Sequence, residues 1–255
     1  MGNTRYLVIL FIFLCKSQYS FAWGNTGHKA IGIVALHYLD AKTKDSIRAY
    51  LGNVGLDSAG MWMDQMRSDP AYDYMKPWHY IYINKGETYK PGTEENVINE
   101  LNKVIDQLKH RNLYSKEQTT TNIKILAHLV EDLHMPLHTG YASDTEGLAV
   151  KVKFDGHTTS LHWVWDEEII QKKHINADTC LALLSKYTKT EIAGMDKTDI
   201  LRWMNESHAY LGNVYDFKGD VIDDKYISKN LGIIEMRLSL SGIRLARLLN
   251  DIFQS

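Results

Sequence analysis

Residues 123–139 read IKILAHLVEDLHMPLHT and combine a helical apolar pattern with side chains that bind metals. His128 and Asp132 are four residues apart, so on a helix they project from the same face. Apolar residues at helical spacing surround them, which indicates that this face is buried. Pro136 ends or kinks the helix, so His138 lies just beyond the break. A buried carboxylate between imidazoles needs a partner, and a divalent metal ion is the usual one.

The start of the chain predicts export. The chain has 255 residues, 44% of them hydrophobic and 24% charged, which is typical of a globular protein with a sizeable core. Residues 1–22 contain a basic residue, an apolar run and the ending Ser-Phe-Ala, the pattern of a cleaved secretory signal peptide. The apolar run is too short for a comfortable membrane span, and no later stretch approaches about 18 apolar residues. We therefore expect a secreted or periplasmic mature domain of residues 23–255 without stable membrane association. An uncleaved membrane anchor is the alternative.

The net charge argues against a general binder of polyanions, and the cysteines argue against a disulfide-bonded protein. Removing residues 1–22 takes away two basic residues and no acidic one, so the formal net charge moves from −2 to −4. Such a chain is no general binder of polyanions, and activity on nucleic acids would require a local site. Cys15 leaves with the signal peptide, and Cys180 then has no partner in the chain. A secreted protein without a disulfide fits a bacterial exported enzyme held together by its core and a metal.

Most of the remaining chain predicts helices. Residues 149–154 alternate as a strand, and Asp155-Gly156 after them is a strong signal for a hairpin turn. Periodic apolar patterns predict four further helices, at residues 94–111, 177–188, 196–216 and 223–252. Repeats, low-complexity tracts and linkers are absent from the sequence. We predict a mainly α fold, a single compact multi-helix domain with a minor β-hairpin.

A second pair of the type His-x-x-x-Asp, His162 and Asp166, makes the first pair harder to explain by packing alone. Cleavage before Trp23 would also free an α-amino group close to His28, and a metal can hold that group deprotonated. The candidate ligands are the Trp23 N-terminus, His28, Asp64, His79, His128, Asp132, His138, His162 and Asp166. This set of nitrogen and oxygen ligands lacks thiolates and suits catalytic zinc. Nine ligands exceed the need of one ion and predict two or three.

Five short motifs carry a resemblance to a known family. They are W-G-x-x-G-H at 23–28, W-x-D-x-x-R at 62–67, W-H-Y at 78–80, H-x-x-x-D-x-x-x-P-L-H at 128–138 and L-H-x-x-W-D at 161–166. In this order the chain resembles the zinc-dependent single-strand-specific nucleases of fungi, plants and bacteria, which also act as 3′-nucleotidases. The resemblance implies a phospholipase C/nuclease-like fold and hydrolysis of single-stranded DNA, RNA and 3′-nucleotides to products that include 5′-phosphate ends. We expect the protein to act as a monomer.

The resemblance also implies a centre of three zinc ions bridged by Asp132. The first ion takes the side chains of Asp64, His79, His128 and Asp132. The second ion takes the amine and carbonyl of Trp23 and the side chains of His28 and Asp132. The third ion takes the side chains of His138, His162 and Asp166. Three Zn²⁺ ions outweigh three aspartates in charge, so such a centre attracts phosphate although the chain is acidic.

The same resemblance implies roles in catalysis and substrate binding. Arg67, beside the ligand Asp64, matches the family arginine that neutralises charge on the phosphoryl oxygens, and Asp64 is placed with it in the catalytic set. Tyr80 matches the position that stacks on an unpaired base, which explains a preference for single strands. Two positions depart from the family. Tyr82 replaces an Asp or Asn that hydrogen-bonds the base, and Ser160 replaces a common Asn, so base preference stays open.

Two other classes of protein remain as alternatives. The related zinc-dependent phospholipases C share a mature N-terminal Trp and a trinuclear site, but their first His lies further from that Trp and their last ligand resembles Glu. The short spacing from Trp23 to His28, together with Asp166 and Arg67, favours the nucleases. A non-catalytic zinc-binding protein is the second alternative. From spacing alone, Asp64 and Arg67 also fit a plain surface salt bridge.

Overall fold

The fold is built almost entirely of helices around one small hairpin. The computed structural model describes residues 23–254, and the predicted signal peptide at 1–22 lies outside the described residues. The α-helices are α1 (Asn25–Tyr38), α2 (Ala41–Leu51), α3 (Leu56–Ala59), α4 (Trp62–Met66), α5 (Val97–Lys109), α6 (Lys116–Leu133), α7 (Leu161–Trp163), α8 (Ile169–Lys172), α9 (Ala177–Leu184), α10 (Lys189–Met195), α11 (Ile200–Ala209), α12 (Leu211–Val214) and α13 (Asp224–Gln254). The 3₁₀ helices are η1 (Pro70–His79), η2 (Arg111–Leu113), η3 (Pro136–Thr139) and η4 (Ala142–Asp144), and η5 (Val164–Glu168) is a π-helix. The predicted mainly α fold with a minor hairpin is confirmed.

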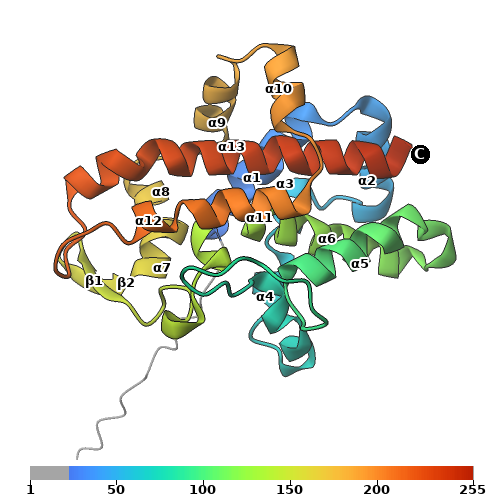
Figure 1. The fold of residues 1–255 in the computed structure, drawn as a ribbon. Coiled ribbons are helices and arrows are strands. Elements are labelled where there is room, and N and C mark those ends of the chain that lie inside the picture. Colours follow the sequence, from blue (N-terminus) through green and yellow to red (C-terminus); the bar gives the residue numbers. More distant parts are fainter. Residues whose placement is uncertain (1–22, 255) are drawn as a thin grey trace, which may run out of the picture.

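The long helix α13 organises the packing of the others. In Figure 1 it crosses the whole molecule, with α11 and α12 along one side and α9 and α10 on the other. Helix α1 packs against α13, and Gly242 permits this close approach. A Cβ atom at Gly242 would lie 2.4 Å from Val34 Cγ1, so any larger residue would push the two helices apart. This contact fixes α1, which carries His28.

Helix α6 carries the metal-ligand stretch and ends where the sequence predicts. Ser115 caps its start in a capping box with Gln118, which satisfies exposed backbone donors. The helix stops at Leu133, and Pro136 then starts the separate turn η3. Side chains of α6 belong to one apolar core cluster, whereas Leu137 belongs to the second. The ligand stretch therefore runs from one core into the other.

The hairpin pairs β1 (Lys151–Phe154) with β2 (His157–Ser160) in antiparallel register. Asp155 and Gly156 form its two-residue turn with φ values of +45° and +83°. Two positive φ values are what the favoured hairpin turn requires, so the Asp-Gly signal was interpreted correctly. The hairpin delivers the chain from β2 directly into α7, which carries His162.

The C-terminal helices differ from the sequence prediction in their limits. The expected helix at 177–188 ends at Leu184, because the Thr188 side chain accepts a bond from the Glu191 N–H and starts α10 instead. The expected helix at 196–216 is divided at Tyr210 into α11 and α12. Among the described helices, none combines the length and the apolarity that crossing a membrane requires.

Candidate metal centre

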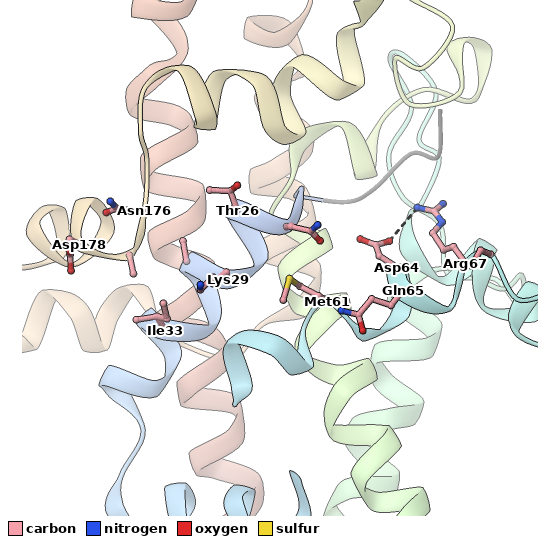
Figure 2. A pocket seen from close by; sticks show the side chains of 13 residues that line it. Thr26, Lys29, Ile33, Met61, Asp64, Gln65, Arg67, Asn176 and Asp178 are labelled. Carbon is pink, nitrogen blue, oxygen red and sulfur yellow. Dashed lines mark hydrogen bonds and ion pairs between the residues drawn. The ribbon is translucent and has the colours of Figure 1, made fainter. Parts of the chain in front are cut away.

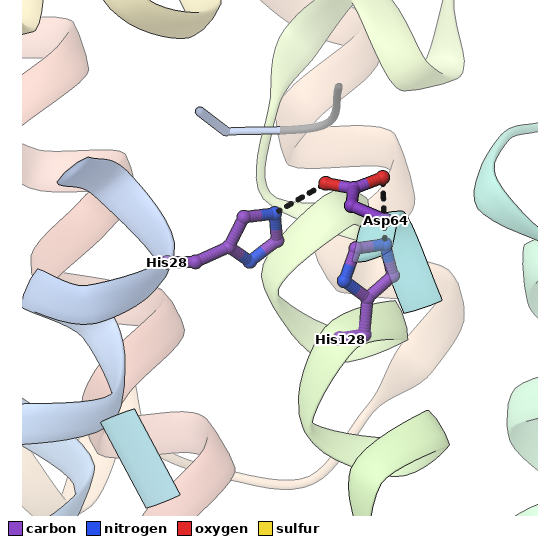
Figure 3. Close-up of side chains that lie close together, drawn as sticks. All are labelled: His28, Asp64 and His128. Carbon is purple, nitrogen blue, oxygen red and sulfur yellow. Dashed lines mark ion pairs between the residues drawn. The ribbon is translucent and has the colours of Figure 1, made fainter. Parts of the chain in front are cut away.

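The first group of ligand side chains comes from three different helices. His28 on α1, Asp64 on α4 and His128 on α6 point toward one another, as Figure 3 shows. His28 Nε2 lies 3.7 Å from Asp64 Oδ2, and His128 Nε2 lies 3.9 Å from Asp64 Oδ1. The two imidazole rings stack with centroids 4.6 Å apart. All three side chains are buried, so the carboxylate and the two imidazoles face each other without bulk water.

Asp132 lies at the middle of the candidate centre. Its Oδ2 is 3.0 Å from His79 Nδ1 and 3.1 Å from His128 Nε2, and these three residues form a second group of converging ligand atoms. Its Oδ1 faces the other way, 3.8 Å from His28 Nε2. His138 Nδ1 is 3.7 Å from Oδ2. One carboxylate thus contacts imidazoles from four separate segments, which is the placement a bridging ligand needs.

The third group lies on the side of η3 and α7. One ligand atom from each of His138, Glu146 and His162 lies within 4.8 Å of the others. Asp166, in η5, places its Oδ2 3.0 Å from His162 Nε2. The backbone N–H of Gly24 donates to the Asp166 carbonyl at 2.9 Å, so the residues at the start of the described chain lie beside this group. Trp23 itself is fully buried there.

Backbone carbonyls orient three of the imidazoles. The Nδ1–H groups of His128, His138 and His162 donate to the carbonyls of Gly60, His79 and Glu146, at 2.5, 2.6 and 2.8 Å. A carbonyl only accepts hydrogen bonds, so Nδ1 must carry the proton and Nε2 keeps its lone pair. A ring whose Nδ1–H donates to a carbonyl, with Nε2 turned toward other ligand atoms, is characteristic of histidines that bind metals.

Burial makes the centre electrostatically unfavourable for the protein alone. Desolvation, with His128 and His138 adding to it, holds the pKa of His28 well below its ordinary value. Desolvation raises the pKa of Asp132 well above its ordinary value and raises that of Asp64 to about 7. Burial lowers the pKa of His162, but Asp166 and Glu146 outweigh it and raise that pKa to about 9. His28 and Asp132 are thus held toward their neutral forms, whereas Asp166 and Glu146 hold a proton on His162. A divalent cation would stabilise such a group of imidazoles and carboxylates and would take the place of that proton.

The centre contains buried polar atoms that no protein group satisfies. Those without a hydrogen-bond partner include Nε2 of His28, His79 and His138, Oδ2 of Asp64, and Oδ1 of Asp132 and Asp166. Buried polar atoms rarely stay unpaired, because each costs about 1–3 kcal/mol. Imidazole nitrogens with carboxylate oxygens and no thiolate are ligands that zinc accepts, so the residues present fit zinc. The structure thus brings all the predicted side-chain ligands together, whereas their division among ions stays a prediction.

Two buried acids beside the centre were missed by the sequence analysis. Glu131 accepts a short hydrogen bond from His28 Nδ1–H, and a Cβ atom at Gly60 would lie 2.3 Å from its Oε2. Glu131 comes three residues after His128, so helical spacing alone places it beside His128 on the buried face of α6 and could have predicted it. Glu146 belongs to the third ligand group but comes from a loop. No sequence periodicity points to it.

Arg67 and Tyr80 border two separate cavities. Arg67 Nη1 lies 3.4 Å from Asp64 Oδ1, and the Arg67 side chain is 17% exposed. Asp64 and Arg67 line a cavity of about 1070 Å³, and Figure 2 shows Asn176 and Asp178 at the side of it away from Arg67. The pair is therefore no plain surface salt bridge, because Asp64 is buried in the metal centre. Tyr80 lines a different cavity of about 320 Å³.

Comparisons with known proteins identify the family to which the chain belongs. The family model described as S1/P1 nuclease matches residues 23–254. Similar curated proteins are Endonuclease 1 of Arabidopsis thaliana, with 25% identity covering 99% of this chain and 94% of the relative, and Nuclease S1 of Aspergillus oryzae, with 22% identity covering 97% and 98%. Nuclease P1 of Penicillium citrinum is 23% identical, covering 91% and 98%. The chain therefore belongs to the S1/P1 nuclease family and is a hydrolase, an endonuclease.

Proposed function

We propose that this protein is a secreted zinc-dependent phosphodiesterase that hydrolyses single-stranded DNA and RNA to 5′-phosphate products and also acts as a 3′-nucleotidase. The convergence of the buried ligand atoms on Asp132, in a chain of the S1/P1 nuclease family, is the observation that carries this proposal. A signal peptide at residues 1–22 would export the chain, and the mature protein would act as a monomer.

The proposed centre holds three zinc ions. Asp64, His79, His128 and Asp132 would hold the first, and the Trp23 amine and carbonyl, His28 and Asp132 the second. His138, His162 and Asp166 would hold the third. Bound zinc lowers the pKa of water and acts as a Lewis acid on phosphoryl oxygens, the chemistry that phosphodiester hydrolysis needs at neutral pH. The protein's part is to keep its imidazoles oriented through Gly60, His79 and Glu146 and to exclude bulk water around Asp132.

Arg67 is the group that would receive the scissile phosphate. It contacts Asp64 on one side and the 1070 Å³ cavity on the other, so a phosphate entering from the cavity meets its guanidinium next to the metal ligands. A guanidinium presents several N–H donors in a planar fork that matches two phosphoryl oxygens. We assign to Arg67 the stabilisation of charge that develops on those oxygens.

Tyr80 would bind the base next to the scissile bond. Its backbone is extended, and its ring lies 4.8 Å from that of Tyr82, centroid to centroid. The Ile81 N–H donates to the carbonyl of the metal-centre residue His138 at 2.8 Å, which ties this segment to the centre. A base can stack on such a ring only when it is unpaired, so this contact supports selectivity for single strands.

The test is hydrolysis by the protein that begins at Trp23. The substrates are a single-stranded DNA, the same sequence as a duplex, a single-stranded RNA, a 3′-mononucleotide and phosphatidylcholine, each with and without chelator. We expect cleavage of both single strands and of the 3′-mononucleotide, lost with chelator and restored by zinc, with little cleavage of the duplex. Equal rates on duplex and single strand would contradict the strand selectivity. Chelator-resistant cleavage would contradict the metal centre, and turnover of the lipid alone would move the protein to the phospholipases.

A further inference from the structure

Glu146 has an unusual backbone for a side chain of its size. Thr145, Glu146 and Gly147 all have left-handed backbone conformations, with φ values of +53°, +59° and +81°. Residues other than glycine avoid this region because Cβ approaches the backbone too closely. Such conformations persist only where the surroundings impose them, and they cluster at functional sites. The Glu146 side chain is only 4% exposed, so the loop turns a carboxylate inward at a cost in backbone energy.

The carboxylate of Glu146 arrives among metal-ligand atoms. One of its oxygens and a ring nitrogen from each of His138 and His162 lie within 4.8 Å of one another. The backbone carbonyl of Glu146 also accepts the Nδ1–H of His162 at 2.8 Å. The same residue thus orients one imidazole and places a negative charge beside it. Asp166 Oδ2 lies 3.0 Å from His162 Nε2, so a second carboxylate contacts one of these two imidazoles.

Tyr82 holds the Glu146 carboxylate in this place. The Tyr82 hydroxyl donates to Glu146 Oε1 at 3.1 Å. Tyr82 is the residue that stands where the resembling nucleases have an Asp or Asn for the base. In this chain, its hydroxyl is directed to the metal centre. In metal sites, a side chain that binds the ion is usually held in position by a hydrogen bond from a neighbouring residue that does not bind the ion.

We propose that Glu146 is a fourth protein ligand of the zinc ion held by His138, His162 and Asp166. This rests on the proposed function, which supplies that ion. Two imidazoles and two carboxylates would supply four protein ligands, a number that zinc commonly takes, so the protein would enclose this ion more completely than with three. Tyr82, by positioning Glu146, is a positioning residue and no ligand.

Zinc retention by variants of the mature protein tests this assignment. Glu146→Gln keeps an acceptor for Tyr82 but removes the charge, and Glu146→Gly removes the side chain. After dialysis against graded chelator, we expect wild-type protein to keep three zinc ions per chain and both variants to release one of them at a chelator strength at least 10-fold lower. Thr145→Gly is the matched control, because Thr145 is exposed and has the same left-handed backbone; it should keep all three ions.

Unfolding temperatures separate a ligand from a residue that only supports the loop. Glycine relieves the left-handed backbone, so Glu146→Gly should unfold at the wild-type temperature or above it in chelator, and below it in zinc. Variants that hold three ions as firmly as wild type would overturn the proposal. So would a Glu146→Gly protein that is equally destabilised with and without zinc. Wild-type protein that never binds a third ion would overturn the proposed function itself, together with this inference.

Discussion

Two buried polar regions of this protein look alike in composition and differ in how their atoms are satisfied. One is the metal centre around Asp132. The other, which we call the arginine cluster, consists of His134, Glu206, Arg237 and Arg244, and joins the end of α6 to α11 and α13. Both contain a buried histidine and a carboxylate, although the carboxylate of the arginine cluster, Glu206, is 27% exposed. In the arginine cluster the donors find protein acceptors, whereas in the metal centre several ligand atoms find none.

Arg237 shows how complete the arginine cluster is. Its Nε–H donates to the His134 carbonyl at 3.1 Å, one Nη to Glu206 Oε2 at 3.1 Å and the other to Ser207 Oγ at 2.5 Å. Arg244 donates to His134 Nε2 at 3.0 Å and to Glu206 Oε2 at 2.7 Å. The guanidinium groups of the arginine cluster thus donate to protein acceptors and require no ligand. Their buried charges can be explained by a structural role.

Two histidines only four residues apart, His134 and His138, differ in whether both ring nitrogens have a hydrogen-bond partner. His134 donates from Nδ1 to the Val130 carbonyl, and its Nε2 accepts from Arg244, so both nitrogens are used. His138 uses only Nδ1, and its Nε2 is buried without a hydrogen-bond partner. An unpaired buried nitrogen therefore distinguishes the candidate ligand His138 from His134, whereas burial alone does not. Five variants test this distinction and the proposed role of Arg67.

The largest effect is expected from Asp132→Ala. This change removes the carboxylate that contacts the first and the second ligand group, so two of the three zinc ions should be lost. Activity should fall more than ~100-fold, beyond the loss typical when a residue that only supports a metal ligand is changed. Metal binding contributes folding energy, so the unfolding temperature should fall as well. Zinc analysis, nuclease assays and thermal unfolding check this. Retention of three ions by this variant would remove the bridging role.

Arg237→Met should damage the fold and leave the metal in place. Methionine keeps much of the side-chain volume but abandons the bonds to Glu206, Ser207 and His134. Glu206 is 27% exposed, so the main cost comes from the buried His134 carbonyl and Ser207 hydroxyl that lose a donor, about 3 kcal/mol of unfolding free energy. Denaturant unfolding measures the loss, and zinc analysis below the unfolding transition should still find the wild-type content. Loss of zinc from folded protein would show that the arginine cluster is part of the metal centre.

Arg67→Ala should slow the reaction without weakening the site. The guanidinium stabilises charge on the phosphoryl oxygens in our proposal, and removing one such donor typically lowers kcat about 10²–10³-fold. Arg67 is no metal ligand, so zinc content should be unchanged. Steady-state kinetics on single-stranded DNA, with zinc analysis of the same preparation, test this. A variant with normal kcat would leave Arg67 only its contact with Asp64.

The smallest effect is expected from His134→Leu, compared with His138→Leu. Leucine at 134 leaves the Val130 carbonyl and the Arg244 guanidinium each short of one partner, which should cost about 1–3 kcal/mol in stability. Zinc content and activity of the folded protein should stay normal. Leucine at 138 should instead lose the third zinc ion. If both variants kept or lost zinc together, the distinction between the two histidines would fail.

The sequence predicted those parts of the molecule that depend on local periodicity. Neighbouring residues alone predict three features: the break of α6 before Pro136, the Asp155-Gly156 turn, and the placement of His162 and Asp166 one turn apart. The candidate ligands were found from spacing and resemblance, and the structure brings their side chains together. These features need no knowledge of distant contacts.

What was missed depends on contacts between distant segments or on strained backbone. The pairing of Glu131 with His28 requires Gly60, which is far from both along the chain. Glu146 reaches the third ligand group from a backbone with a positive φ value, and a glutamate in the sequence does not predict that conformation. The hydrogen bond from Tyr82 to Glu146 likewise joins two loops. Such features follow from the assembled fold, which periodicity does not describe.

The central claim is that the unsatisfied ligand atoms around Asp132 hold three zinc ions. The most direct test is the zinc content per chain, by elemental mass spectrometry, of mature protein that begins at Trp23 and has been dialysed free of loosely bound metal. The account predicts three zinc ions per chain in wild type and one in Asp132→Ala. A wild-type chain that holds none, or the same zinc content in both proteins, would contradict it.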